Sequence, residues 1–476
     1  MRHHLAVLGA VLAALAAPAV AFGEDNAIVR ENKRAGTSVW LLKDHADVRP
    51  YTADGWRRNK AIEGYCSQAS IQAGETLTVY VSTDPASEFQ VDFYRLGYYG
   101  GKGGRLMLSK GPLAGEPQPT PRDGQNALIE CHWRPAITFA IPQNWVSGVY
   151  LGKLTALDTK AEAYIVFIVR DNRKADLIFQ CSDLTWQSYN RWPAWRSLYD
   201  FRGNRWHTSP GDEVGFDRPY ATYYNGLPAD FAPISNGSGE FLLWEFPLAF
   251  WLEKEGYDVT YISNLDTHAD PKGLLRAKGF LSVGHDEYWT QEMYDNVSRA
   301  RDEGVNLAFF SGNSISGRIS LKPSTDGRPN RVFGRIDRFR NEMELMGASS
   351  HGVGMADWVC ETPDHWVYAG TGMKKGDAIP NLIGWEYHGK PVGSAPSLIV
   401  LATSPIRGKP NAPAHTGTIY DGSKGNFVFN AGTCWWNMVL SSPPGSVNPP
   451  NRDFSKEDPR VQQITRNILD RMIKDK

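Results

Sequence analysis

The chain has 476 residues, too many for one small core, and this length predicts two or three domains. Its 51 lysines and arginines almost balance its 52 aspartates and glutamates. This even charge argues against a nucleic-acid-binding protein, which normally carries a basic stripe.

The N-terminal residues have the pattern of an export signal. A basic start is followed by an apolar run over residues 5–17 and then by Ala19-Val20-Ala21, the small-x-small pattern of a cleavage site. An uncleaved membrane anchor is the less favoured alternative, because a span needs about 20 apolar residues. We therefore predict a signal peptide over residues 1–21 and export to the periplasm or exterior of a bacterium, without a membrane span in the mature chain.

The five cysteines are consistent with an oxidising compartment, where disulfides form. Cys66 and Cys131 lie in the same part of the chain, so a disulfide between them is one expectation. No two cysteines form a C-x-x-C motif, and this argues against a structural zinc site.

Residues 22–172 have the pattern of short β-strands. Polar and apolar side chains alternate over residues 75–82 and again over 89–95. Two further apolar segments, 145–154 and 163–169, are typical of closing strands. Since no amphipathic helix interrupts them, we predict an all-β sandwich of immunoglobulin type.

Strands alternate with helices after residue 173. Apolar segments predict strands at 175–181, 257–262, 279–283 and 305–310, and amphipathic patterns predict helices at 245–255, 290–303 and 459–474. Such runs are too apolar for half-exposed strands. We therefore predict that residues 173–476 form an α/β domain of glutamine-amidotransferase-like type, with a mostly parallel sheet covered on both faces.

Polar residues gather where these strands end, at segments 180–190, 284–289 and 311–314. Ligands bind at the carboxyl ends of the strands in open α/β sheets. The second and third segments flank one helix, so their strands should be neighbours. This places His285, Glu287 and Asn313 close together.

The turn at residues 284–289 is the strongest candidate for chemistry. His285 and Glu287 are two residues apart and would point the same way in an extended turn, whereas Asp286 would point the other way. A carboxylate there can bind a metal, with the imidazole as its neighbour or as a general base. The alternative is structural: Asp286 or Glu287 caps the next helix, and His285 bonds to the backbone.

Several segments in order resemble the large subunit family of N,N-dimethylformamidase. They are residues 94–101, 189–199, 217–220, 285–288, 311–313, 363–367 and 384–386. The resemblance covers most of the chain after residue 21. It implies hydrolysis of a small amide at a mononuclear ferric centre held by two tyrosines and one glutamate.

The resemblance assigns the metal ligands residue by residue. Glu287 matches the carboxylate ligand, and Tyr189 and Tyr220 match the tyrosines, with Tyr199 as an alternative because the spacing from Tyr220 to Glu287 departs from the family pattern. Phenolate and carboxylate are hard anionic ligands that suit Fe(III). An iron ion with an open position would act as a Lewis acid and lower the pKa of water.

The same resemblance assigns the remaining roles. His285 is expected as general base or proton shuttle, and Asn313 as a donor to the developing oxyanion. The expected substrate is a small molecule with an amide or related C–N bond. The amidase works with a small partner subunit that is not evident here, and the sequence leaves open whether the chain forms a homo-oligomer.

Two other readings compete with the ferric site. In the first, Cys181 acts with His285 and Glu287 in a metal-free thiol hydrolase, although no Gly-x-Cys-x-Gly elbow is present. In the second, the protein is a non-catalytic envelope protein that binds glycans on aromatic faces. The residues considered for that surface are Trp186, Trp192 and Trp195.

Overall fold

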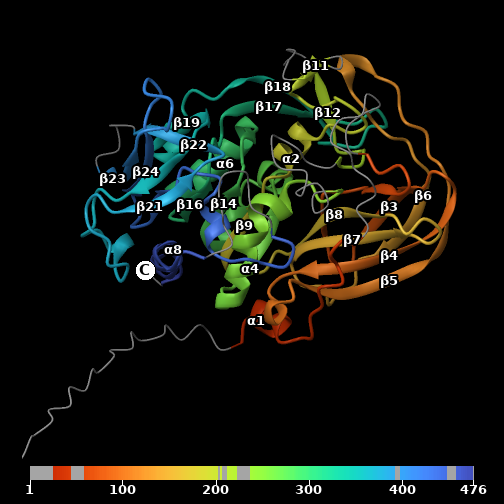
Figure 1. Ribbon diagram of the computed structural model, residues 1–476, viewed down its shortest axis with the longest axis horizontal. Helices are drawn as coiled ribbons and strands as arrows, with labels where there is room; N and C mark the ends of the chain where they lie inside the picture. Colours follow the sequence, from red (N-terminus) through yellow and green to blue (C-terminus); the bar gives the residue numbers. More distant parts are fainter. Residues whose placement is uncertain are drawn as a thin grey trace, which may run out of the picture.

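The computed structural model describes residues 25–43, 58–201, 204–205, 212–221, 236–391, 397–446 and 457–474. Over these residues the protein is mostly β, with several mixed sheets and a smaller number of helices (Figure 1). The predicted signal peptide, residues 1–21, lies outside the described ranges. None of the helices within those ranges is long and apolar enough to cross a bilayer.

Two sheets near the N-terminus pack face to face. Their strands are β1 (Glu63–Cys66), β2 (Ser70–Gln72), β3 (Thr76–Ser82), β4 (Ser87–Leu96), β5 (Gly104–Gly115), β6 (Pro135–Ala140), β7 (Gly148–Ala156) and β8 (Glu162–Arg170). One sheet has the order β1-β3-β6 and the other β2-β8-β7-β4-β5. Leu77 and Val79 of the first sheet share an apolar cluster with Phe93 and Phe167 of the second. The two sheets therefore bury their facing sides against each other, as a sandwich requires, and β7 and β8 are buried on their other face as well. The immunoglobulin topology stays a prediction.

The expected disulfide between Cys66 and Cys131 is absent. Both cysteines are free, buried thiols, and they belong to separate apolar clusters. The prediction was wrong because proximity in sequence does not bring the two side chains into one cluster.

A nine-stranded mixed sheet forms the centre of the larger half of the protein. Its strands are β9 (Ala175–Cys181), β13 (Val259–Ser263), β14 (Ala277–Gly284), β16 (Asn306–Ser311), β19 (Ala348–Val353), β22 (Glu386–Pro391), β23 (Ile399–Ser404), β24 (His415–Asp421) and β25 (Phe427–Asn430). The order is β13-β9-β14-β16-β25-β24-β22-β19, and β23 pairs with β24. The helices associated with it include α4 (Phe246–Glu255), α5 (Asn264–Ala269), α6 (Gln291–Asp302), α7 (Glu342–Met346) and α8 (Pro459–Ile473).

The prediction of a mostly parallel sheet holds for only one side of this sheet. Strands β13, β9, β14, β16 and β25 pair in parallel, whereas β24, β22, β19 and β23 pair antiparallel. Parallel neighbours need a long crossover, usually a helix, but antiparallel neighbours can be joined by a short turn. Residues 422–426 form such a turn between β24 and β25. The sheet is therefore mixed, and its glutamine-amidotransferase-like character stays a prediction.

The helix ends follow their sequence signals. Gly256 has a φ of 83° and ends α4 in the left-handed conformation that favours glycine. The Thr290 hydroxyl accepts the backbone N–H of Met293 and caps α6. Both ends were predicted from the sequence, and both are confirmed.

A smaller sheet lies beside the end of β14. Its order is β12-β18-β17-β15, and the strands are β12 (Glu213–Gly215), β15 (Tyr288–Trp289), β17 (Gly317–Lys322) and β18 (Val332–Arg338). The remaining strands form the pairs β10 (Asp200–Phe201) with β11 (Asn204–Arg205), and β20 (Ala356–Val359) with β21 (Ala378–Ile383). Because only three residues separate β14 from β15, the turn between them is held by both sheets.

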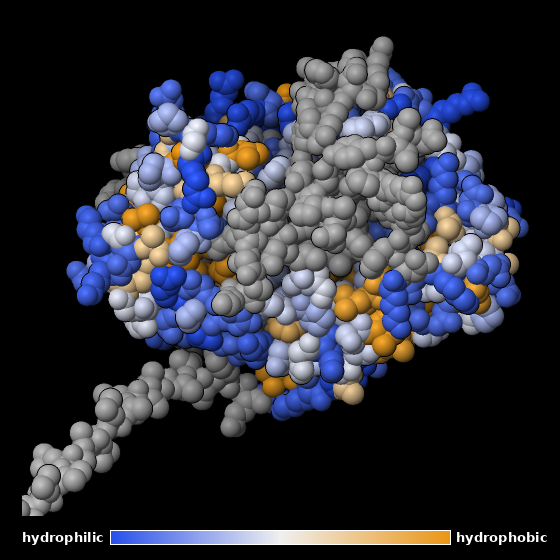
Figure 2. Space-filling view, viewed as in Figure 1, coloured by the Kyte–Doolittle hydropathy of each residue, from blue (hydrophilic) through white to orange (hydrophobic). Residues whose placement is uncertain are grey.

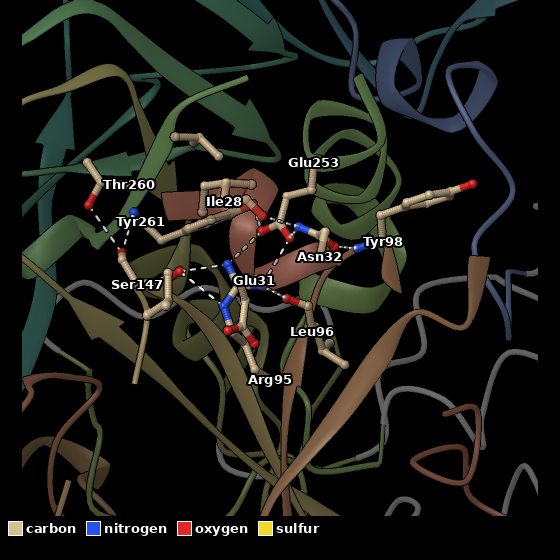
Figure 3. A network of polar contacts seen from close by, with 12 residues as sticks. Ile28, Glu31, Asn32, Arg95, Leu96, Tyr98, Ser147, Glu253, Thr260 and Tyr261 are labelled. Atoms are coloured by element: carbon tan, nitrogen blue, oxygen red, sulfur yellow. Dashed lines mark hydrogen bonds and ion pairs between the residues drawn. The ribbon is translucent and has the colours of Figure 1, made fainter. Parts of the chain in front are cut away.

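The predicted domain boundary near residue 172 falls in the short link between β8 and β9, and it stays a prediction. A buried polar network connects residues before and after this link (Figure 3). Arg95 of β4 donates to both carboxylate oxygens of Glu253 of α4, at 3.0 and 2.8 Å. Glu253 also accepts from Tyr261 of β13 and from Asn32 of α1 (Ala27–Asn32), at 2.9 and 2.8 Å. Neither charged side chain is exposed.

The surface that faces the viewer in Figure 2 is largely hydrophilic, with small apolar areas between charged side chains. The most exposed large apolar side chains in the described ranges lie on separate elements: Val39, Leu106, Leu275, Ile336, Val353 and Ile399. Scattered exposed apolar residues of this kind are ordinary on a protein surface.

His415 in β24 should make the protein less stable in acid. The side chain is fully buried, and its Nε2 lies 3.0 Å from the carbonyl oxygen of Ala431. Burial lowers the pKa of His415 from 6.5 to about 4. Between those values the unfolded chain takes up a proton that the folded chain excludes, so stability is lost as the pH falls through this window. We expect His415→Gln to reduce the stability lost on acidification by roughly 3 kcal/mol. Urea unfolding of both proteins at pH 7.5 and 4.5 checks it, and equal losses in the two proteins would contradict it.

Candidate active site

Three buried side chains, His285, Glu287 and Glu386, converge at the carboxyl end of β14. Their potential metal-ligating atoms all lie within 4.8 Å of one another. His285 and Glu287 stand in the turn between β14 and β15, and Glu386 begins β22. Gly284 makes the turn possible: its φ is 77°, and a Cβ there would lie 2.8 Å from Glu245. This cluster could hold a metal ion.

His285 lies between carboxylates on both sides of its ring. Its Nε2 is 2.6 Å from Glu386 and 3.5 Å from Glu287, and its Nδ1 is 3.7 Å from Glu240. Burial opposes protonation of His285, but the negative charge of Glu386, its hydrogen bond to the imidazole and the nearby Glu240 carboxylate outweigh it and raise the pKa of His285 well above the ordinary value. The imidazole is therefore placed to hold a proton in contact with two acceptors.

Glu287 receives two phenols on one oxygen. Tyr189 and Tyr199 donate to Glu287 Oε2 at 2.9 and 2.7 Å, and their rings stack with centroids 4.3 Å apart. Tyr189 ends α2 (Asp183–Tyr189), and Tyr199 lies in the loop that follows. Burial and the nearby charge of Glu287 raise the pKa of both phenols well above the ordinary value.

Two residues of the small sheet, Tyr288 and Arg335, lie next to the Tyr199 phenol. The Tyr288 hydroxyl in β15 donates to the Tyr199 hydroxyl at 2.6 Å. Arg335 of β18 donates to Tyr288, and its guanidinium lies 5.4 Å from the ring centroid of Tyr199. A cation over these ring faces favours negative charge on the phenols.

Asn313 lies beside the His285–Glu386 pair, and its position next to His285 was predicted from the neighbouring strands. Its amide donates to Glu386 Oε2 at 2.9 Å, and its backbone has a φ of 51°, which asparagine tolerates better than most residues. Its side-chain oxygen is buried and has no hydrogen-bond partner among the described residues. An unpaired buried acceptor of this kind is expected where a ligand binds.

Glu386 is the site residue that the sequence reasoning missed. It lies in one of the segments that resemble the amidase family, but no motif or spacing linked it to His285 or Glu287. Its place depends on β22, which is in the antiparallel part of the sheet. That part was not predicted, so the neighbour across it was not predicted either.

Tyr220 does not share this cluster. Its ring lies 6.4 Å from Trp186 and it bonds to Gln187, and no contact joins it to Glu287 within the described chain. Tyr199, the alternative ligand, does reach Glu287, and the choice between the two tyrosines stays a prediction.

Asp286 has a structural role, though not as a helix cap. Its carboxylate accepts from Gln180 of β9, Asn264 of α5 and Ser282 of β14, at 2.7, 3.0 and 2.8 Å. Burial raises its pKa to about 6. Asp286 thus ties three elements together under the turn, while Thr290 caps the helix.

The geometry does not favour a thiol hydrolase. Cys181 is fully buried, and burial together with the charges of Glu245 and Asp183 raises its pKa well above the ordinary value. A thiol that is held protonated is a poor nucleophile. Within the described ranges, no hydrogen bond or ion pair joins Cys181 to His285.

The tryptophans proposed for glycan stacking are also largely covered. Trp186 is 3% exposed, and Trp192 is fully buried with its indole N–H bonded to Glu63. Trp195 is only partly buried, with Arg191 over its ring. Two of the three faces are therefore not available to a sugar.

The charges of the site suit a cation. Glu240, Glu287 and Glu386 lie around one imidazole, and burial raises the pKa of Glu240 and Glu287. Both carboxylate oxygens of Glu240 have no hydrogen-bond partner among the described residues. Buried carboxylates normally need a positive partner. A donor set of carboxylates and phenols, short of positive charge, fits a hard metal ion.

The family model described as N,N-dimethylformamidase beta subunit-like, C-terminal, matches residues 90–451. The chain belongs to this family. The match covers every residue of the site described above, so family membership supports an amidase-like hydrolase with a small-molecule substrate. No curated protein matches the chain.

Solved structures add little to this assignment. The N-terminal domain of mmIFT52 is 10% identical over 46% of this chain and 86% of its own, with a TM-score of 0.28. Bacteroides uniformis β-glucuronidase 2, covalently bound to cyclophellitol-6-carboxylate aziridine, is 8% identical over 54% of this chain and 28% of its own, with a TM-score of 0.15. Both TM-scores are too low to support a shared fold.

Proposed function

We propose that this member of the dimethylformamidase-like family is a metal-dependent hydrolase that cleaves an amide or related C–N bond with water. The observation that supports it most is the meeting of two phenols and a carboxylate at Glu287, directly beside the His285–Glu386 pair. Acid–base groups next to a metal-ligand set are what amide hydrolysis requires.

We propose Fe(III) as the metal and Tyr189, Tyr199 and Glu287 as its ligands. The two hydroxyls already converge on one Glu287 oxygen, so the three donors share a single small volume. Phenolate and carboxylate are hard anionic donors that prefer a hard, highly charged ion. Bound there, the ion supplies Lewis acidity, which activates water at neutral pH and polarises a substrate carbonyl.

The neighbouring side chains handle protons and orientation. His285 holds a proton between its carboxylate neighbours; it can donate this proton to the departing amine and then accept one from water. Asn313 uses one N–H to orient Glu386, and its second N–H is left to donate to a substrate oxygen. Burial of the whole cluster strengthens each of these interactions, because the site has a low local dielectric.

Tyrosine variants test which phenols bind the metal. We expect Tyr199→Phe to weaken iron binding by about 10- to 100-fold and to reduce the visible phenolate-to-iron absorption, because it removes one donor beside Glu287. Tyr220→Phe is the matched control and should keep both properties, since Tyr220 contacts Trp186 and Gln187 instead. Iron titration and visible spectra decide between them; the opposite result would restore Tyr220 as the ligand.

The function itself is tested by element analysis of the purified chain, followed by a panel of small amides. We expect near-stoichiometric iron, a phenolate-to-iron band and release of an amine from at least one amide. A folded protein that stays colourless and free of metal after incubation with iron would contradict the proposal.

We also propose that the protein is exported after loss of residues 1–21, as an immunoglobulin-like sandwich joined to a glutamine-amidotransferase-like domain. The family name refers to a beta subunit, so assembly with a partner subunit belongs to the same proposal. The intact mass of the chain recovered from the periplasm tests the cleavage, and the mass of the native particle tests the assembly.

A further inference from the structure

Arg218 is buried and bonds almost entirely to the backbone of the segment that carries both site tyrosines. We call residues 187–200 the tyrosine loop. The Arg218 guanidinium donates to the carbonyls of Gln187, Trp192 and Arg196, at 3.2, 2.8 and 2.7 Å, and to that of Gly215 at 3.2 Å. Three of these four carbonyls belong to the tyrosine loop.

The charge of Arg218 has no carboxylate partner among the described residues. The side chain is 1% exposed, and burial lowers its pKa to about 10, so it remains protonated at neutral pH. Burying a charge is costly unless other groups compensate it. Here backbone carbonyls provide the compensation, and most of them belong to the tyrosine loop. The buried charge is therefore compensated only while the loop keeps this conformation.

A second residue secures the same loop. The Asn190 side-chain oxygen accepts the backbone N–H groups of Trp192 and Ala221, at 3.1 and 3.0 Å. Its amide donates to the carbonyl of Pro219 at 2.9 Å. Residues 215–221, which we call the anchor segment, therefore hold the tyrosine loop at both its beginning and its middle.

We propose that Arg218 is a positioning residue that sets the distance between the Tyr189 and Tyr199 hydroxyls. Tyr189 lies between the Gln187 and Trp192 carbonyls in sequence, and Tyr199 follows the Arg196 carbonyl by three residues. With all three carbonyls on one guanidinium, the two phenols come to the same oxygen of Glu287. The significance for iron rests on the proposed function, whereas the control of loop geometry does not.

Arg218→Met and Arg218→Lys test this role. The methionine keeps the volume and loses every donor, and the lysine keeps the charge but concentrates its donors on one nitrogen. Arg173→Met is the matched control, because Arg173 also donates to a backbone carbonyl, that of Val259, which lies outside both the tyrosine loop and the anchor segment. Hydrogen exchange of the tyrosine loop and iron titration are measured on the full chain.

We expect amide exchange in the tyrosine loop of Arg218→Met to accelerate roughly tenfold or more, while β14 and β16 stay protected. Iron affinity should fall about 10- to 100-fold, as for other groups that orient ligands. Arg218→Lys should show smaller changes of the same kind, and it serves if the methionine variant does not fold. Arg173→Met should leave both properties of the loop close to wild type.

Unchanged loop exchange in both Arg218 variants would overturn the inference, and so would equal changes in Arg173→Met. Accelerated exchange in a protein that binds no iron even as wild type would support the positioning role and count only against the ferric function. The two proposals therefore fail in different measurements.

Discussion

Glu287→Gln should remove the metal and the activity together. Glutamine keeps the size of the side chain but loses the anionic oxygen on which Tyr189 and Tyr199 converge. Because Lewis acidity contributes several kcal/mol to amide hydrolysis, we expect kcat/KM to fall on the order of 1000-fold or more. Iron content should fall from near-stoichiometric to background, and element analysis with amide kinetics measures both.

Glu292→Gln is the matched control for this experiment. Glu292 lies in the first turn of α6, only a short way along the chain, but its side chain is 63% exposed. We expect it to keep iron and activity. A Glu287→Gln protein that binds iron as tightly as wild type would exclude Glu287 as a ligand.

Arg95→Met should destabilise the protein by about 3–5 kcal/mol. The variant leaves Glu253 buried without its cation, and Tyr261 and Asn32 are its remaining hydrogen-bond donors among the described residues (Figure 3). An uncompensated buried charge costs far more than the pair itself contributes, because both charges were desolvated on folding. Urea unfolding at neutral pH measures the change.

Two further variants separate the buried charge from general damage. Adding Glu253→Gln to Arg95→Met should recover part of the lost stability, since the orphaned charge is then absent. Arg173→Met breaks a partly exposed pair with Asp258 and should cost about 1 kcal/mol or less. Equal losses in Arg95→Met and Arg173→Met would show that burial of the pair does not matter.

The elements predicted with success carry local signals. Thr290 and Gly256 mark helix ends through hydrogen bonding and backbone conformation within a few residues. Apolar runs such as β14 and β16 are buried on both faces, so their patterns do not depend on distant partners. The antiparallel strands beyond residue 347 lack such signals, because their direction depends on which strand lies beside them.

The core of the candidate site was also accessible from local sequence. His285 and Glu287 share one turn, and Asn313 follows the adjacent parallel strand, so short-range rules place them together. The choice between Tyr199 and Tyr220 was not accessible in this way. It depends on which tyrosine the chain after α2 brings to Glu287, and Tyr199 is the one that contacts this carboxylate.

Composition, periodicity and short motifs were thus sufficient for the mixed β and α character and for the strand-end turn at residues 284–289, and the resemblance of several ordered segments indicated the family. Packing was needed to bring Glu386 to His285, to bring Tyr199 to Glu287 and to place Asp286 under the turn rather than at a helix start. These three contacts join residues far apart in the chain. Backbone propensity acts over a few residues, whereas such contacts arise from burial and hydrogen bonding once the sheets have assembled.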